Sequence, residues 1–471
     1  MAVLLFGEFR LDLVGKQLWR GDRLVELSGT PLLMLCHLAE RSADAPDEAA
    51  GRLVTKDELR NLVWGEVHVS DETIRGCIST IRKALADDPQ QPRYLKTDGR
   101  AGWRFMVKVT RALPPPLRAG RSPQPPNGPY DPNWYVPRLQ EEFDILGCIE
   151  YPGRPVVVYG PQGCGKTTMV RRALERIGTP QEGAPPPRVL PISLRSFAEE
   201  HLTSIDAMLR ELGRWMLDPS EEDEERVEGK LAAAWAKGID PKLKLKKLVR
   251  TQLLPPGQVV YLVLSNVERL APWRFQASFF DMLRAWQEAE GLGGLRLILE
   301  TSVPPRLFPL GGQSPMWTKV RRIPVNALTA HQIAQMANLY ELHPTAGACA
   351  KLGELVGGLA ALCRHALYRA AVRQLTLEKI LQEYEQEPTT FGVFADHLED
   401  LHQWLEQQPA PGSTGKNAVS KQLQEARRGV SLQDDEAWPL VRKGLVTETE
   451  VRGVYRLRCR LYEDFVAGRV R

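Results

Sequence analysis

The sequence predicts a multidomain α/β protein, and three observations support this fold class. Its 471 residues correspond to roughly three domains of about 150 residues each. Two proline-rich stretches, residues 113–117 and 122–132, favour extended backbone rather than a packed core and separate an N-terminal part from the rest. Apolar residues make up 43% of the chain and charged residues 25%, as in ordinary globular proteins, so each part can bury a core.

The charge balance and the cysteines exclude several classes of protein. Lys and Arg number 62 and Asp and Glu 58, which leaves a net charge of +4, so any contact with nucleic acid must come from a local patch. The seven cysteines lie far apart, which excludes a zinc ribbon or a disulfide framework and favours a reducing cytoplasm. Because the start lacks a signal-peptide pattern and no run of about 18 apolar residues occurs, we expect neither export nor a membrane span.

Residues 1–110 predict a small antiparallel sheet, three helices and a final hairpin. Strand-like runs alternate with glycine turns over residues 4–27, and helical patterns follow at residues 30–39, 55–63 and 70–85. Ser70 can cap the third helix. The apolar residues that recur on one face of this helix, and that we expect to be buried, are Ile74, Ile78, Ile81 and Leu85.

The opposite face of the third helix has the chemistry of a surface that reads DNA. Arginine side chains read guanine edges, and hydroxyl and lysine groups meet phosphates or base edges. The hairpin at residues 93–105 places another arginine at its glycine-bracketed tip, where a minor groove attracts it. The candidate DNA-binding residues are Arg75, Ser79, Thr80, Arg82, Lys83 and Arg100.

Nearly all of residues 4–108 resemble the OmpR/PhoB-type winged-helix DNA-binding domain, in the variety found in sensors such as CadC. The matching stretches are residues 54–59, 63–64, 69–72, 78–85 and 94–105. The resemblance implies double-stranded DNA as a partner, with a winged helix used for protein contact as the alternative. The receiver domain and the transmembrane segment usual in that family are missing, so phosphorelay and membrane sensing are not implied.

A phosphate-binding loop follows the apolar strand predicted at residues 155–159 and precedes the helix predicted at 168–177. It carries the full G-x-x-x-x-G-K-T pattern in its strand–loop–helix context, which predicts ATP or ADP with Mg²⁺ as cofactor. Lys166 would reach phosphate oxygens and the Thr167 hydroxyl would ligate the metal. Cys164 is a small residue of the loop, with a redox role as the alternative. The candidate binding residues are Gly160, Pro161, Gln162, Gly163, Cys164, Gly165, Lys166, Thr167 and Thr168.

A nucleotide hydrolase also needs a carboxylate at the end of a neighbouring strand. The strand predicted at residues 259–264 is followed by Ser265 and Asn266, neither of which can act as a general base. Glu268, and Glu300 at the end of the next strand, are the candidate catalytic carboxylates. Surface or turn positions are the alternative for both, since a shifted carboxylate misses in-line geometry. We therefore expect nucleotide binding, with hydrolysis slow or dependent on a partner.

The W-Y-V-P-R sequence at residues 134–138, the loop and a helical region resemble AAA-like ATPases related to the STAND and Orc/Cdc6 groups. The resemblance covers about residues 130–390 and implies a parallel α/β core, a helical lid and a place for Arg138 near the adenine. Residues 391–471 resemble the C-terminal winged helix of the same family. A hairpin expected at residues 447–462 either packs on the core, which we favour, or grips DNA through Arg452, Arg456, Arg458 and Arg460.

The expected domains are a winged helix at 1–110, a proline-rich linker at 111–133, an AAA-like core at 134–325, a helical lid at 326–390 and a C-terminal winged helix at 391–471. This order predicts a cytoplasmic, bacterial-type DNA-binding regulator in which ATP and ADP favour different lid positions. A DNA-dependent ATPase that loads or recruits partners, and a STAND-type defence sensor, are the alternatives. Each of these three functions is compatible with a homo-oligomer that forms on ATP binding and with a protein partner.

Overall fold

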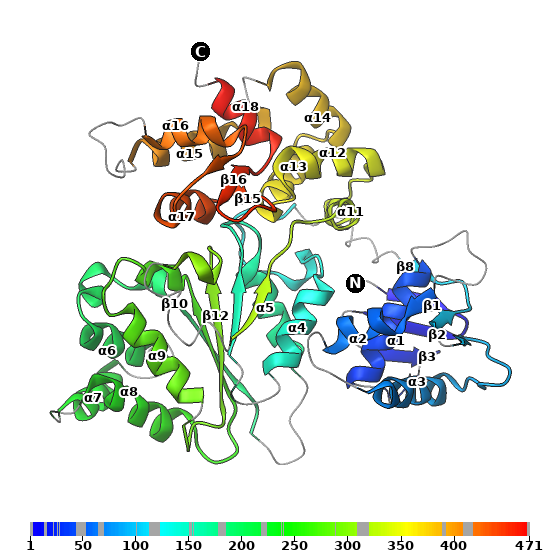
Figure 1. The fold of residues 1–471 in the computed structure, drawn as a ribbon, viewed down its shortest axis with the longest axis horizontal. Coiled ribbons are helices and arrows are strands. Elements are labelled where there is room, and N and C mark those ends of the chain that lie inside the picture. Colours follow the sequence, from blue (N-terminus) through cyan, green and yellow to red (C-terminus); the bar gives the residue numbers. More distant parts are fainter. Residues whose placement is uncertain are drawn as a thin grey trace. The chain divides into compact units, whose positions relative to one another are not determined.

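The protein is represented by a computed structural model (Figure 1). It describes residues 3–13, 17–21, 23–25, 27, 29–43, 53–64, 70–99, 101–112, 123–149, 153, 155–177, 185–217, 224–236, 238, 240–287, 289–308, 320–388, 392–407 and 418–468. The chain divides into two units, residues 1–120 and 121–471. No helix in the described ranges is long and apolar enough to cross a lipid bilayer.

Among its described residues, the first unit contains two small antiparallel sheets and three helices. The sequence predicts the N-terminal sheet, the three helices and the final hairpin, and the structure adds a third strand to that hairpin. One sheet has the order β4-β3-β2-β1-β8 and the other the order β5-β7-β6. The strands are β1 (Val3–Phe6), β2 (Phe9–Asp12), β3 (Gln17–Arg20), β4 (Arg23–Val25), β5 (Leu53–Thr55), β6 (Leu95–Asp98), β7 (Gly102–Phe105) and β8 (Thr110–Ala112), and the helices are α1 (Gly29–Ala43), α2 (Lys56–Trp64) and α3 (Asp71–Leu85).

Helix α3 confirms the expected cap and buried face. The Ser70 side chain accepts a hydrogen bond from the Thr73 N–H, and Ala86 ends the helix in the left-handed conformation. Asp87 then accepts three backbone N–H bonds, at 2.7–3.0 Å, from the residues that lead into β6. These bonds fix the hairpin β6–β7 beside α3. The four predicted core residues, Ile74, Ile78, Ile81 and Leu85, are buried.

The second unit is built on a five-stranded sheet of order β10-β11-β12-β9-β13 in which every neighbouring pair is parallel. In Figure 1, α4 lies beside β9 and β13, and α6 lies beside β10. Because all these strands are parallel, their carboxyl ends meet at one edge of the sheet, which is the usual place for a ligand in such sheets. The strands are β9 (Val156–Tyr159), β10 (Arg188–Ser193), β11 (Val260–Ser265), β12 (Leu295–Thr301) and β13 (Arg321–Pro324), and the helices are α4 (Leu139–Ile149), α5 (Lys166–Leu174), α6 (Ile205–Met216), α7 (Glu224–Trp235), α8 (Pro241–Leu248) and α9 (Gln276–Gln287).

A helical lid and a small C-terminal module complete this unit. The lid contains α11 (Ala330–Leu339), α12 (Ala346–Val356), α13 (Ala360–Val372) and α14 (Leu377–Gln386). The module contains α15 (Ala395–Gln407), α16 (Ala418–Ala426), β14 (Val430–Ser431), α17 (Asp434–Lys443), β15 (Val446–Glu448), β16 (Val454–Leu457) and α18 (Arg460–Gly468). Its sheet has the order β14-β16-β15.

The hairpin expected at residues 447–462 ends earlier than the alternation suggested. Strand β16 stops at Leu457, and Arg460 begins helix α18. Leu461 is buried on a face of that helix together with Tyr462 and Phe465. The expected alternation was wrong there because apolar residues at positions 461, 462 and 465 also fit helical spacing.

Residues 123–133 differ from the extended linker that the prolines suggested. The Tyr340 hydroxyl donates to the Gln124 carbonyl at 2.9 Å, and the Tyr130 hydroxyl donates to Glu175 at 2.8 Å. These contacts attach the segment to the second unit. Proline has little backbone freedom to lose, so ordering such a segment against a surface costs less entropy than ordering an ordinary loop.

Candidate functional site

The phosphate-binding loop joins β9 to α5 and depends on three glycines. Gly163 and Gly165 have φ of 77° and 96°, in the left-handed region, and Gly165 is the N-cap of α5. A Cβ atom on Gly160 would lie 3.0 Å from the Cys164 sulfur. The turn therefore needs glycine at each of these positions, and it directs backbone N–H groups at the start of a helix toward one point, which suits a phosphate.

Lys166 lies across the loop. Its ammonium group donates to the Gly160 carbonyl at 2.7 Å and to the Pro161 carbonyl at 3.0 Å. This arrangement keeps the cation at the mouth of the loop, where a phosphate oxygen can replace a carbonyl as its acceptor.

Glu300 is the carboxylate that meets the loop. The Thr167 hydroxyl donates to Glu300 Oε2 at 2.5 Å, and Glu300 is only 1% exposed. Burial raises the pKa of Glu300, the Glu268 charge raises it further, and the Thr167 hydrogen bond and the Lys166 charge lower it. Glu268 is fully buried, so the surface position considered for both carboxylates is wrong.

These buried carboxylates fit a hydrated Mg²⁺ ion beside Thr167. Glu300 Oε1 and both carboxylate oxygens of Glu268 have no hydrogen-bond partner among the described residues. Buried polar atoms are almost always partnered, so these oxygens suit a cation or its water ligands. No group of three or more His, Cys, Asp or Glu that could hold a metal occurs in the described ranges.

Arg138 ties the loop to the lid. It is 3% exposed, donates to the Cys164 carbonyl at 2.9 Å and also donates to the Asn326 carbonyl. These two contacts position the loop against the start of the lid. Sequence reasoning missed the buried Glu142, which accepts from the Tyr135 hydroxyl at 2.6 Å and from the Arg138 N–H at 2.8 Å and pairs with Arg176. The spacing of Arg138 and Glu142, one helical turn apart, was the available signal.

A pocket of about 270 Å³ lies beside the loop. Its walls come from residues 126–131, residues 134–138, the P-loop and Thr168, and the lid. The lid contributes Leu328, Met336, Ala360, Ala361 and Arg364. This is the candidate site for the base and ribose of a nucleotide whose phosphates bind the loop.

The C-terminal module contacts the loop from the other side, through residues that sequence reasoning did not single out. The Gln162 N–H donates to the Arg442 carbonyl at 3.1 Å. A Cβ on Gly444, whose φ is 80°, would lie 2.9 Å from Pro161. Arg442 also lies 3.9 Å from Glu268, and burial lowers the pKa of its guanidinium although the Glu268 charge opposes this shift. The turn after α17 therefore packs directly on the phosphate-binding loop.

The arginines of the hairpin expected at residues 447–462 differ in exposure and contacts. Arg458 donates to the Gly444 carbonyl at 2.8 Å and so packs inside the module, whereas Arg452, Arg456 and Arg460 are exposed. Among the arginines of the core and lid, Arg306 pairs with Glu448 of the C-terminal module.

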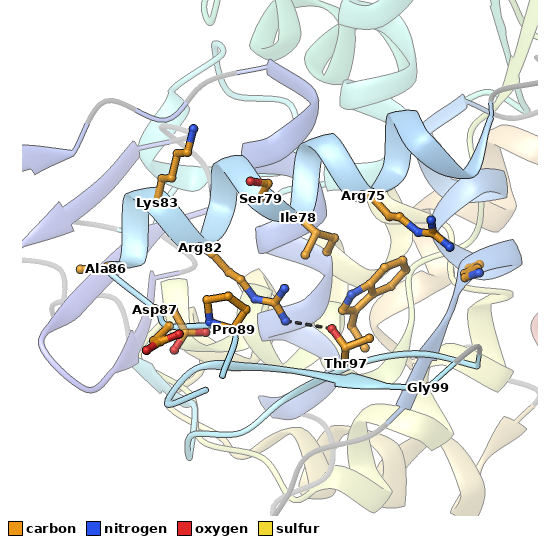
Figure 2. A pocket seen from close by; sticks show the side chains of 13 residues that line it. Arg75, Ile78, Ser79, Arg82, Lys83, Ala86, Asp87, Pro89, Thr97 and Gly99 are labelled. Atoms are coloured by element: carbon orange, nitrogen blue, oxygen red, sulfur yellow. Dashed lines mark hydrogen bonds between the residues drawn. The ribbon is translucent and has the colours of Figure 1, made fainter. Parts of the chain in front are cut away.

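In the first unit, a groove of about 670 Å³ lies between α3 and the hairpin β6–β7 (Figure 2). Arg75, Ser79, Thr80 and Lys83 are exposed on α3, although the Thr80 hydroxyl donates to the Gly76 carbonyl. Arg82 instead donates to the Leu95 carbonyl and to the Thr97 hydroxyl, both at 2.9 Å. It joins the helix to the hairpin.

Two further observations concern the candidate DNA face. Arg100, proposed for the tip of the hairpin, lies outside the described residues. Lys56 of α2, which the sequence did not indicate, lines the same groove and pairs with Asp71 at 2.9 Å. The groove therefore combines the basic face of α3 with a lysine from a second helix.

Comparisons with known proteins match different families to the two parts of the chain. The family described as an AAA-like domain matches residues 125–468, nearly three quarters of the chain, and the family described as transcriptional regulatory protein, C terminal, matches residues 47–105. Transcriptional regulator HilA of Salmonella typhi is 32% identical over 120 residues, which are 26% of this chain and 19% of HilA. The chain thus spans about a fifth of the length of this curated relative.

Two solved structures are similar to the separate parts. The DNA-binding domain of RstA from Klebsiella pneumoniae, solved in complex with the RstA box, is 28% identical, with 22% of this chain and 95% of that chain covered and a TM-score of 0.19. A Walker-type ATPase of Pyrococcus abyssi is 12% identical, with 71% of this chain and 96% of that chain covered and a TM-score of 0.45. The chain belongs to the AAA-like domain family and carries, ahead of that domain, a winged-helix domain of the OmpR/PhoB type.

Proposed function

We propose that this protein is a DNA-binding transcriptional regulator in which the nucleotide state of the AAA-like unit controls DNA binding or assembly. The exposed basic face of α3 supplies the DNA contact, and the P-loop holds ATP or ADP with Mg²⁺. The match of residues 47–105 to transcriptional regulatory proteins and the similarity to the transcriptional regulator HilA support the first part. The observation that carries the switch is the hydrogen bond from the Gln162 N–H to the Arg442 carbonyl.

This hydrogen bond supports a competition between the C-terminal module and phosphate for the same donor. Backbone N–H groups of the loop are the donors that a phosphate uses, and the Arg442 carbonyl occupies one of them. A diphosphate that leaves this N–H to Arg442 is compatible with the seated module, whereas a triphosphate that uses it is not. ATP and ADP then have different affinities for the two arrangements, which a switch requires.

The other residues of the nucleotide site have separate roles in the proposed function. Lys166 binds phosphate oxygens, and Arg138 holds the loop against the start of the lid. Thr167 and Glu300 would hold Mg²⁺, which would neutralise phosphate charge.

The test compares DNA affinity between nucleotide states. A duplex is selected by the full chain from a random-sequence pool, and its affinity is measured by fluorescence anisotropy with ATP, with ADP and without nucleotide. We expect a difference of about fivefold or more between ATP and ADP, the lower end of ordinary allosteric coupling. Lys166→Ala serves as the control and should remove the difference. Equal affinities in a wild-type protein that demonstrably binds both nucleotides would refute the switch.

A DNA-dependent ATPase is the second candidate, and the Thr167–Glu300 contact favours it. A carboxylate bonded to the P-loop threonine can orient the metal shell that hydrolysis needs. ATP turnover that rises with DNA and is lost in both Lys166→Ala and Glu300→Gln would support this function. Turnover equal to that of Lys166→Ala would exclude it.

A further inference from the structure

Residues 126–130 form one wall of the pocket beside the P-loop. Pro126, Gly128, Pro129 and Tyr130 line it together with lid residues that include Leu328 and Ala360. These residues directly follow the stretch that connects the pocket to the winged-helix domain in the sequence. The wall is apolar apart from the Tyr130 hydroxyl, which suits the flat face of a base.

The segment is anchored at both ends, and the two anchors lie on different parts of the unit. At one end, Gln124 receives hydrogen bonds from Tyr340, the residue that follows α11, and from Arg364 of α13, at 2.9 and 3.1 Å. Burial raises the pKa of Tyr340 to about 12, so its hydroxyl remains a donor at neutral pH. These contacts attach the segment to the lid.

The other anchor is on the P-loop helix. The Tyr130 hydroxyl donates to Glu175 at 2.8 Å, and the Arg171 guanidinium lies 4.3 Å from the centre of the Tyr130 ring. Burial and the Glu175 carboxylate raise the pKa of Tyr130, which keeps this donor protonated. The segment therefore bridges the lid and the helix that begins at the phosphate-binding loop, and it closes the pocket between them.

We infer that residues 123–131 are part of the nucleotide-binding site, and that a bound adenine nucleotide holds this segment against the lid and the P-loop helix. The inference rests on the proposed function, because it concerns the same pocket. A ligand that contacts both the segment and the lid stabilises their docked arrangement by its affinity for it. Release of residues 123–133 would lengthen the connection to the winged-helix domain by roughly 30 Å, at about 3.1 Å per residue of extended backbone.

The test weakens the anchor at the lid end. Tyr340→Phe combined with Gln124→Ala removes the two hydrogen bonds to the lid, together with the bond from the Gln124 amide to the Pro129 carbonyl inside the segment. Neither of the two mutated residues lines the pocket. The matched control, Tyr384→Phe combined with Gln258→Ala, makes the same chemical changes at the Asp464 and Pro186 contacts. Affinity is measured on the full chain with N-methylanthraniloyl-ADP. We expect about tenfold weaker binding in the first double variant, which corresponds to about 1.4 kcal/mol and so to the loss of one or two hydrogen bonds, and wild-type binding in the control.

A second readout follows the segment itself. Chymotrypsin cleavage after Tyr130 is timed by mass spectrometry of the fragments, with and without ADP. We expect ADP to slow this cleavage in the wild type and not in Lys166→Ala. Equal affinities of the two double variants, or cleavage after Tyr130 at the same rate with and without ADP in a protein that binds ADP, would overturn the inference and leave nucleotide binding intact. A wild-type chain that binds no ADP would overturn the proposed function and the inference together.

Discussion

Two arginines of α3, Arg75 and Arg82, should respond to mutation in different ways. Arg75 is exposed at the groove, whereas the Arg82 guanidinium donates hydrogen bonds to the Leu95 carbonyl and the Thr97 hydroxyl. Arg75→Ala should therefore weaken DNA binding without changing stability. Arg82→Ala should first destabilise the winged-helix domain, because the attachment of α3 to the hairpin is lost (Figure 2).

The magnitudes follow from these contacts. An arginine that reads a guanine contributes about 1–3 kcal/mol, which is roughly 5- to 150-fold in affinity, and one that meets a phosphate changes the salt slope by about 1. Hydrogen bonds from a charged group contribute about 1.5–3 kcal/mol when buried. Because Arg82 is partly exposed, we expect Arg82→Ala to lower the free energy of unfolding by about 1–2 kcal/mol.

The assay measures fluorescence anisotropy with the selected duplex at several salt concentrations, together with urea unfolding of each variant. Arg10→Ala is the matched control, because it removes the same charge from an exposed position on β2. Thr97→Val tests the Arg82 contact from the other side and should show part of the same loss of stability. The reasoning is refuted if Arg75→Ala binds DNA as Arg10→Ala does at every salt concentration.

Three further predictions concern the second unit. Because burial raises the pKa of Glu300, the nucleotide-free protein should lose stability as pH rises from the ordinary carboxyl pKa through the raised one. Glu300→Gln should remove this loss and raise the free energy of unfolding by about 1 kcal/mol at pH 7. Urea unfolding at pH 5 and pH 8 measures both effects. Gly444→Val, which strains a φ of 80° and crowds Pro161, should cost about 1–3 kcal/mol and make DNA affinity independent of nucleotide, measured by anisotropy. Glu142→Gln should cost about 3 kcal/mol, because it removes the carboxylate that pairs with the buried Arg176, measured by urea unfolding.

Each of these predictions has an outcome that contradicts it. Identical pH profiles for the wild type and Glu300→Gln would mean that this carboxyl titrates normally in the folded protein. A Gly444→Val protein that keeps its response to nucleotide would separate the turn after α17 from the switch. A stability loss below about 1 kcal/mol in Glu142→Gln would mean that other groups compensate Arg176.

Local patterns predicted the parts of the protein whose chemistry is contained in one segment. The P-loop needs glycines, a lysine and a threonine at fixed spacing, and α3 needs one apolar and one basic face, so both could be recognised from the sequence. The docking of residues 123–133 could not, because Tyr340 and Arg364 are more than 200 residues away in the chain. The contact between Gln162 and Arg442 depends in the same way on how a distant module packs.

The choice between the two candidate carboxylates also depended on the order of the strands. Strand β12 lies directly beside β9, and its Glu300 is in register with Val158 near the end of β9, so its side chain can meet Thr167. Glu268 follows β11, one strand further away, and approaches Arg442 instead. The Glu268 charge acts on Glu300, yet the two carboxylates have different partners, one in the P-loop and one in the C-terminal module. In the proposed switch, departure of Arg442 would remove the cation nearest Glu268 and leave its charge beside Glu300, which would increase the attraction of the site for Mg²⁺. Opening of the module and binding of the metal with a triphosphate would then favour each other.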